Sequence, residues 1–186
     1  DDPAANSSTL PSSSDATLVY LHMPILYPGN VQEVLDLGVH AVALSRITDT
    51  LYIAAHPTPA DADYLRDLPT HLMLSIRMRP PHPSVRAAAE LWHHLPCMDT
   101  PLTPLPMLLL WTGVEMALPV IKEGKNVVVH CAYGRHRSVA LACCILIGQG
   151  YSSGNAMALV KRQRPVADPY ARYIRARIER FEARWT

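Results

Sequence analysis

The stretch that decides the fold is residues 126–138, which read NVVVHCAYGRHRS. Residues 126–131 form a continuous run that is rich in β-branched side chains, and such a run predicts a buried, central strand. Residues 137–147 are apolar nearly all round, which predicts a buried helix. A cysteine therefore ends a strand, and an arginine begins a helix six residues later.

The loop between this strand and this helix predicts a binding site for an anion. A tight turn before a helix points several backbone N–H groups into one concavity, and the helix N-terminus adds the positive end of its dipole. Gly134 permits the backbone dihedrals that such a turn needs. Cys131 lies in the same field, so we expect its pKa to be lowered and its thiolate to act as a nucleophile.

Three neighbouring side chains fit phosphoryl transfer. The planar guanidinium of Arg137 can bind two phosphate oxygens. This interaction becomes stronger as negative charge spreads over the oxygens in the transition state. The Ser138 hydroxyl can donate to the sulfur when a phosphocysteine intermediate collapses. His130 precedes the cysteine, and we expect its ring to fix the loop through hydrogen bonds.

The run HCAYGRHRS resembles the HCxxGxxR[ST] signature of the protein tyrosine phosphatase superfamily. The alternative interpretation is a buried cysteine beside a helix-capping arginine. The resemblance implies that Cys131 is the nucleophile of a phosphatase and that Arg137 is its phosphate clamp. It also implies a phosphate loop that binds substrate, made of His130, Ala132, Tyr133, Gly134, Arg135, His136 and Arg137.

Three further stretches resemble the dual-specificity branch of that superfamily. They are residues 47–65, 95–105 and 156–169, similar to its opening strand and helix, its general-acid loop and its AxxxVxxxRPxAxP segment. The resemblance covers about residues 46–186. It implies an α/β fold with a central, mostly parallel sheet flanked by helices, and the alternation of expected strands and helices agrees. It implies a hydrolase that dephosphorylates phosphotyrosine, phosphoserine or phosphothreonine in proteins.

Asp99 lies about 30 residues before the cysteine, where the resemblance implies a general acid. An alkoxide or phenoxide leaves poorly, so a carboxylic acid must protonate it, and the same carboxylate can then activate water. Glu90 is the alternative acid, and a turn-forming aspartate is the structural alternative for Asp99. Cys97 could form a protective disulfide with Cys131, although a plain loop cysteine is the simpler interpretation.

Two positions depart from the family pattern. Ser75 stands where the family often carries an asparagine that braces the phosphate loop, and Tyr170 stands where an asparagine usually follows the RPxAxP stretch. Neither change removes a catalytic group, but both bear on the fine geometry of the loop.

The substrate and the role leave alternatives open. Arg135 and His136 make the loop basic, and GRHRS is similar to the GKHRT of atypical phosphatases that act on inositol pyrophosphates. An inositol (pyro)phosphate is therefore an alternative to a phosphoprotein substrate. A phosphatase-fold scaffold that binds without hydrolysing is an alternative to the enzyme. Docking on a larger complex would use the N-terminal extension or the basic C-terminal helix.

Composition and charge describe one globular domain with appended segments. Of 186 residues, 49% are hydrophobic, which suffices for one core. Residues 1–16 predict a disordered tail, residues 17–45 an N-terminal extension, and residues 46–186 the catalytic domain. Residues 1–120 carry 5 Lys/Arg against 12 Asp/Glu, and residues 121–186 carry 12 against 4. The basic C-terminal third suits an anionic ligand.

The remaining features concern compartment and cofactors. Four cysteines without a CxxC spacing favour a reducing, intracellular compartment over a disulfide framework. The sequence has no run of 18 or more apolar residues, so we expect no membrane span. No secretory signal is visible, so the cytoplasm is the default expectation, and import into mitochondria stays open. The His93–His94 pair has no third ligand at metal-binding spacing, so we expect neither a metal nor another cofactor.

Overall fold

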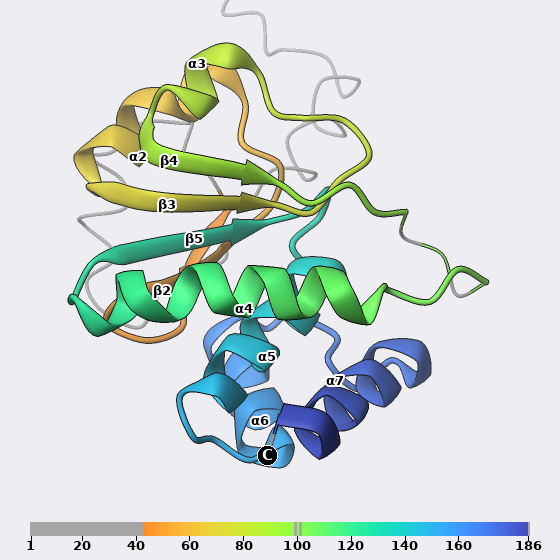
Figure 1. The fold of residues 1–186 in the computed structure, drawn as a ribbon. Coiled ribbons are helices and arrows are strands. Elements are labelled where there is room, and N and C mark those ends of the chain that lie inside the picture. The colour runs from red at the N-terminus through yellow and green to blue at the C-terminus, as the bar shows by residue number, and fades with distance from the viewer. Residues whose placement is uncertain (1–42, 99, 101, 186) are drawn as a thin grey trace, which may run out of the picture. The chain divides into compact units, whose positions relative to one another are not determined.

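The structure is a computed structural model that describes residues 43–98, 100 and 102–185. The predicted tail and nearly all of the predicted extension lie outside these residues, and so does Asp99. Within the described residues, one five-stranded sheet lies between two layers of helices (Figure 1). The two layers differ in size, because the longer helices gather on one face of the sheet.

The sheet has the strand order β1-β2-β5-β3-β4. Its strands are β1 (Leu44–Arg46), β2 (Leu51–Ala54), β3 (Thr70–Ser75), β4 (Ala89–His94) and β5 (Asn126–His130). β2, β5, β3 and β4 run parallel, and β1 pairs antiparallel with the outer edge of β2. β5 is the middle strand of the sheet. Val127, Val128 and Val129 are fully buried, as expected of a strand covered on both faces. The predicted α/β fold with a mostly parallel sheet is confirmed.

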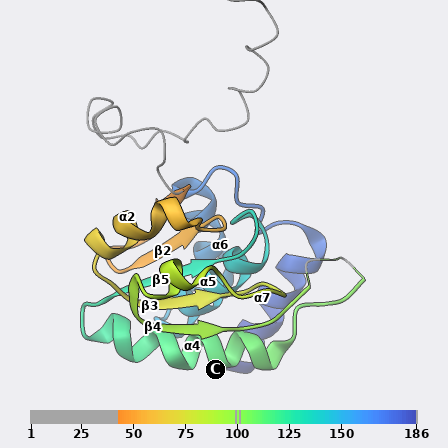
Figure 2. The ribbon, with the colours of Figure 1, turned by 90° about the horizontal axis from the view of Figure 1, so that it is seen from above.

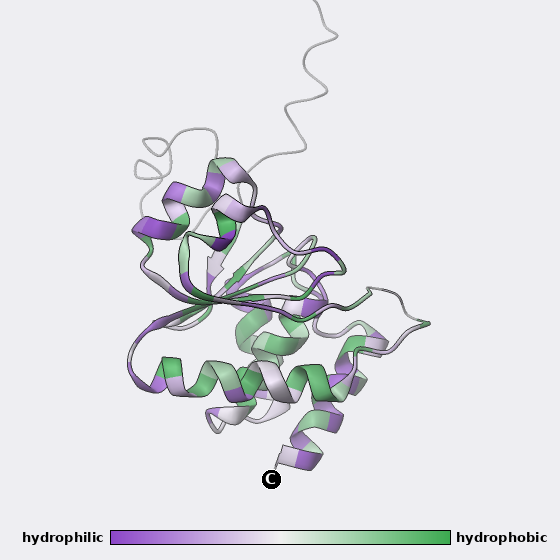
Figure 3. Cartoon of the chain, turned by 45° about the horizontal axis from the view of Figure 1, so that its top comes forward, coloured by the Kyte–Doolittle hydropathy of each residue, from purple (hydrophilic) through white to green (hydrophobic). Residues whose placement is uncertain are grey.

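The larger helical layer covers one face of the sheet (Figures 1 and 2). It contains α4 (Met107–Lys122), α5 (Arg137–Gly148), α6 (Ser153–Gln163) and α7 (Arg172–Trp185). α4 and α5 pack on the sheet, and α6 and α7 pack on α5. α5 is therefore buried on all sides, as its apolar sequence predicts, and it is predominantly green beneath the sheet in Figure 3. None of the described helices has the length and apolar character that a membrane span requires.

The C-terminal helix is fixed by its apolar face. Ile174, Ile178 and Phe181 are fully buried, as their spacing predicts. Phe181 lies 5.1 Å from Trp111 of α4 and 5.2 Å from Trp185, measured between ring centroids. The spacing of apolar residues predicts a helix over residues 168–185, but α7 begins at residue 172. A turn containing Pro169 precedes it, and proline disfavours helical backbone in the residue before it.

Short helices cover the other face of the sheet. They are the 3-10 helix η2 (Pro59–Asp61), α2 (Ala62–Asp67) and α3 (Pro83–Arg86). The sequence predicts one short helix over residues 60–68, opened by Pro59, and the structure has it in two parts. α3 lies where the sequence predicts only a proline-rich turn. Pro83 starts it, and the His82 ring nitrogen accepts a hydrogen bond from the Ser84 backbone at 3.3 Å, which caps it.

The carboxyl ends of the parallel strands bring three connections together. Cys131 follows β5, Arg77 lies two residues beyond β3, and His56 lies two residues beyond β2. The Ile76 backbone N–H donates to the His130 carbonyl at 2.9 Å, and that of His56 donates to the Ala132 carbonyl at 3.1 Å. Ligand sites of open α/β sheets occur at such an edge.

Candidate active site

Cys131 lies at the base of the loop that joins β5 to α5, and it is 1% exposed. Its Sγ accepts hydrogen bonds from the Gly134 backbone N–H at 3.2 Å and from the Ser138 hydroxyl at 3.3 Å. Gly134 has a φ of +62°, and a Cβ at this position would lie 2.8 Å from the Ala54 carbonyl oxygen. Glycine is therefore required for the loop to close around the sulfur.

The pKa of Cys131 is lowered. Burial alone would raise it, but hydrogen bonds from the Ser138 side chain and backbone, the charge of Arg137 and the Tyr133 backbone favour the thiolate and outweigh burial. Cys143 and Cys144 of α5 provide the contrast, because burial raises both of their pKa values. The lowered pKa is thus a property of the loop. All four cysteines, including Cys97, are free thiols.

Arg137 connects the phosphate loop to the segment that precedes α4. It is the first residue of α5 and is 7% exposed. Its Nη1 donates to the Cys97 backbone carbonyl at 2.9 Å. Asp99 follows two residues after Cys97, but it lies outside the described residues. Its role as general acid stays a prediction.

Glu90, the alternative acid, lies at the wrong end of the sheet. It is near the start of β4, where Ala89 is paired with Thr70, the first residue of β3. Its carboxylate is mostly exposed and lies 3.7 Å from the His71 ring. Cys131 follows the opposite end of the neighbouring strands, so the structure separates Glu90 from the candidate site.

Arg164 is a residue of the site that the sequence analysis missed. It lies 3% exposed between α6 and α7. Its guanidinium donates to the carbonyls of Gly134 at 2.7 Å and Tyr133 at 3.4 Å, and also to the Ala43 carbonyl at 2.9 Å. Because these loop carbonyls turn toward Arg164, loop N–H groups are left to face the sulfur. The RP pair of the family-like segment contains this arginine, but spacing alone does not show its reach.

The predicted bracing of the loop by His130 is not seen, and Ser75 does not take over the role of the family's asparagine. Neither ring nitrogen of His130 makes a hydrogen bond within the described residues, and the buried Ser75 hydroxyl also lacks one there. Burial and, second, electrostatic repulsion from His56 lower the pKa of His130 to about 3, while the Cys131 backbone acts in the opposite direction. The His130 ring instead stacks on the His56 ring at 6.1 Å. Arg164, not His130 or Ser75, braces the loop.

Arg135 and His136, in the middle of the loop, lie near the carboxylate of Asp168, which offsets part of the loop's positive charge. Tyr133 is 77% exposed. Asp168 lies 3.6 Å from Arg135 and 4.0 Å from His136, measured between charged atoms. Its backbone N–H also donates to the Arg135 carbonyl at 2.9 Å. The extra positive charge of the loop is therefore partly matched within the fold.

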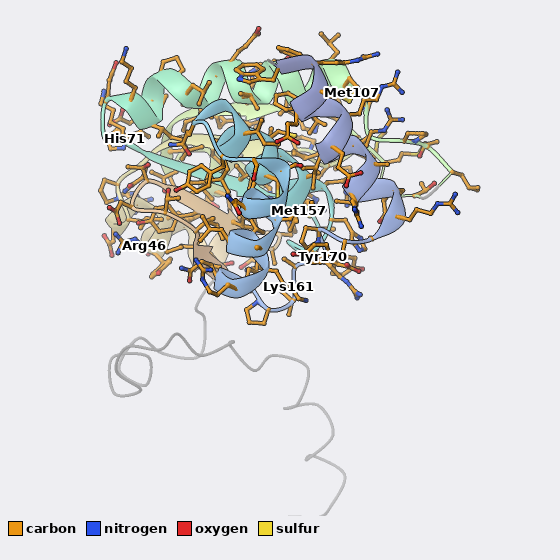
Figure 4. All side chains as sticks on the ribbon, turned by 90° about the horizontal axis from the view of Figure 1, so that it is seen from below. Arg46, His71, Met107, Met157, Lys161 and Tyr170 are labelled. Carbon is orange, nitrogen blue, oxygen red and sulfur yellow. The ribbon has the colours of Figure 1, made fainter. Side chains whose placement is uncertain are left out.

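The turn that presents Asp168 is closed by a lysine. Lys161 donates from Nζ to the carbonyls of Pro165 at 2.7 Å and Ala167 at 2.9 Å. Figure 4 shows Lys161 at the end of α6, with Tyr170 on the connection to α7. Tyr170 is 49% exposed, so the departure from the family's asparagine places a surface side chain at this position.

Arg77 is the second site residue that the sequence analysis missed. It is half-buried and contacts the Nδ1 atom of His56. Its backbone carbonyl accepts a hydrogen bond from the His94 ring at 2.7 Å. Burial and, second, the charge of Arg137 lower the pKa of Arg77, while the Cys131 thiolate raises it. Although these histidines gather at the site, the described residues include no group of three side chains placed to hold a metal ion.

Comparisons with known proteins point to phosphatases. No family model matches the chain. Mouse dual specificity phosphatase 28 is 29% identical over 126 residues, which cover 67% of this chain and 76% of that protein. The human protein of the same name is 29% identical over 127 residues, covering 68% and 70%.

Two solved structures share the fold. Human DUSP28 matches with a TM-score of 0.66 and 23% identity, covering 75% of this chain and 93% of that one. PTPMT1 in complex with PI(5)P matches with a TM-score of 0.67 and 20% identity, covering 76% and 96%. With its HCxxGxxR[ST] loop, the chain is similar in sequence to dual specificity phosphatases and shares the fold of the cysteine-dependent protein tyrosine phosphatases.

Proposed function

We propose that this protein dephosphorylates phosphoproteins through a phosphocysteine intermediate on Cys131. The observation that carries the proposal is the environment of one sulfur. Cys131 is buried, receives hydrogen bonds from Gly134 and Ser138, and has a lowered pKa. A thiolate at the base of an amide-lined loop combines a nucleophile with an anion site.

The reaction proceeds in two displacements. The Cys131 thiolate attacks phosphorus, and the bond to the leaving oxygen breaks while Asp99 gives that oxygen its proton. Arg137 stabilises the charge on the equatorial oxygens. Water, deprotonated by Asp99, then displaces the thiolate, and the Ser138 hydroxyl stabilises the departing sulfur. Asp99 is assigned from its place two residues after Cys97, whose carbonyl holds Arg137.

Hydrolysis of p-nitrophenyl phosphate by the purified protein tests this proposal. We expect the wild type to turn over, Cys131→Ser to be inactive while still binding vanadate, and the matched variant Cys143→Ala to stay active. Cys143 is the suitable control because its raised pKa keeps it a thiol. A wild type that is inactive but still binds vanadate would favour the alternative, a scaffold that binds phosphate groups without hydrolysing them.

The preferred substrate is a phosphoprotein rather than an inositol (pyro)phosphate. The basic Arg135 and His136 suggest a polyanion, but Asp168 lies near both of them. PTPMT1 has been crystallised with a phosphoinositide, so the comparison is worth making directly. Phosphopeptides should have a higher kcat/KM than inositol phosphates, and the reverse order would favour the alternative.

Docking and compartment are part of the same proposal. The outer face of α7 carries the exposed residues Arg172, Arg175, Arg180 and Arg184, which suit an acidic partner surface. The predicted N-terminal extension, the other docking element, lies mainly outside the described residues. Four free thiols suit a reducing intracellular compartment. If α7 docks, charge reversal at Arg172 and Arg180 should release the protein from larger complexes in gel filtration of cell extracts.

A further inference from the structure

The connections after β2 and β3 hold Arg77 and His56 beside the phosphate loop. The Ile76 N–H bonds to the His130 carbonyl, one residue before Cys131, and the His56 N–H bonds to the Ala132 carbonyl, one residue after it. Both connections are thus tied by backbone hydrogen bonds to the residues on either side of the nucleophile. A side chain placed here reaches the surroundings of the reacting phosphate.

The Arg77 side chain is held by a neutral group. Its Nη1 contacts the Nδ1 atom of His56. Burial and, second, the charge of Arg77 lower the pKa of His56, so the imidazole stays neutral and can accept from the guanidinium. This one contact uses one of the five N–H donors of an arginine. The rest of the fork makes no hydrogen bond with the described residues, so it can bind a ligand there.

Among the described residues, Arg77 lacks the carboxylate partner that several arginines of the domain have. Arg46, Arg66, Arg135 and Arg175 each have a carboxylate within 4.0 Å. Within the described part of the chain, no carboxylate forms an ion pair with Arg77. It also lies within electrostatic range of a second cation, Arg137. The Cys131 thiolate offsets part of this repulsion, and two neighbouring guanidinium groups favour the binding of a further anion.

We propose that Arg77, positioned by His56, binds a second anionic group of the substrate, a phosphate or carboxylate carried next to the scissile phosphate. The inference rests on the proposed phosphatase function and names its substrate class. Arg137 holds the phosphate that reacts, and the Arg77 fork holds the one that stays. The shared chemistry covers a phosphopeptide with an acidic or phosphorylated neighbour and a small bisphosphate.

Matched substrate pairs test this subsite. One pair is phenyl phosphate and phenyl phosphate with a meta-carboxylate. Another is a phosphotyrosine peptide with serine or phosphoserine two residues away, and a third is an inositol monophosphate and bisphosphate. The variants are Arg77→Met, which keeps the aliphatic stem, Arg77→Lys, which keeps the charge, and Arg66→Ala, which removes a distant exposed arginine.

We expect Arg77→Met to lower kcat/KM for the doubly anionic member by about tenfold, mainly through KM, because a charge-assisted bidentate contact is lost. The singly anionic member should lose much less, Arg77→Lys should recover part of the loss, and Arg66→Ala should match the wild type. The pair with the largest loss identifies the source of the second anion.

Other outcomes separate the two proposals. A wild type that hydrolyses every substrate, with an Arg77→Met variant that is unchanged on all of them, would overturn the subsite and leave the phosphatase intact. Equal losses on both members of each pair would also overturn it, because Arg77 would then act on the scissile phosphate. A wild type that hydrolyses none of the substrates would overturn the phosphatase itself.

Discussion

At the scale of single residues, the reactivity of Cys131 depends on a small number of donors. The sulfur is almost fully buried, and an isolated buried thiol has a raised pKa, as Cys143 and Cys144 show. Ser138 is the side chain whose hydrogen bond contributes most against burial. Its removal should therefore have a larger effect on the thiolate than its small size suggests.

We predict that Ser138→Ala raises the pKa of Cys131, because the thiolate loses the hydrogen bond from the Ser138 hydroxyl. Since the thiolate is present only above the pKa, the rate of alkylation by iodoacetamide should rise at a higher pH than in the wild type. Ser84→Ala, on α3, is the control. An unchanged profile would show that backbone N–H groups and Arg137 suffice.

Asp99 can be tested through the leaving group. Asp99→Ala should slow the hydrolysis of phenyl phosphate by about a hundredfold or more, because phenoxide needs a proton to leave. It should slow the hydrolysis of p-nitrophenyl phosphate much less. Steady-state kcat measures both. Glu90→Gln, at the far end of the sheet, should change neither rate. If the hydrolysis of both esters slowed equally, Asp99 would not be the general acid.

Arg164 supports the loop at the level of structure as well as chemistry. Arg164→Met leaves several buried carbonyls without their donor, so we expect the free energy of unfolding to fall by about 3 kcal/mol. Vanadate affinity should fall too, because the loop amides lose their alignment. Urea denaturation and vanadate titration measure these effects. Arg162→Met, exposed on the preceding helix, should leave both unchanged; an equal loss in both variants would contradict the role.

At the scale of helices and strands, the sequence predicts what is periodic and continuous. β5 and α5 follow from the valine run and from a helix that is apolar all round. β1 was missed because LSR is short and mixed, and only its pairing with β2 makes it a strand. α3 was missed because prolines suggest a turn, although Pro83 in fact starts the helix.

The candidate site also has a part that the sequence predicts and a part that it does not. The loop around Cys131 is contiguous, so its residue types and spacing predict it. Arg164 reaches Gly134 across 30 residues and Ala43 across 121, and Arg77 meets His56 across 21. Such contacts depend on strand order and side-chain direction, which no local pattern contains.

The α7 helix provides a prediction at this scale. Phe181 is fully buried between Trp111 and Trp185, so Phe181→Ala should lower the free energy of unfolding by about 3–5 kcal/mol. Chemical denaturation measures the change. Arg180→Ala, on the exposed face of the same helix, should have little effect. A loss below about 1 kcal/mol for Phe181→Ala would mean that α7 contributes little to the fold.

At the scale of the whole molecule, the buried His130 couples stability to pH. Its pKa is about 3 in the fold, against 6.5 ordinarily. Between these values the unfolded chain binds the proton and the folded chain does not, so folding stability should fall as pH falls, by up to about 1.4 kcal/mol per unit. His130→Gln should flatten this dependence in urea titrations from pH 7 to 4, whereas exposed His93→Gln should not. An equal slope in all three proteins would contradict this role of His130.

The three tryptophans divide between the two cores on either side of the sheet, and this has an optical consequence. Trp111 and Trp185 lie 4.7 Å apart between ring centroids on one side of the sheet. Trp92 belongs to the smaller core on the other side, where the Arg86 guanidinium lies 4.9 Å from its ring centroid. Two indoles this close couple as chromophores, so near-ultraviolet circular dichroism should carry an exciton band that disappears when the C-terminal turn frays. Trp92 emission would remain as an independent monitor of the opposite face.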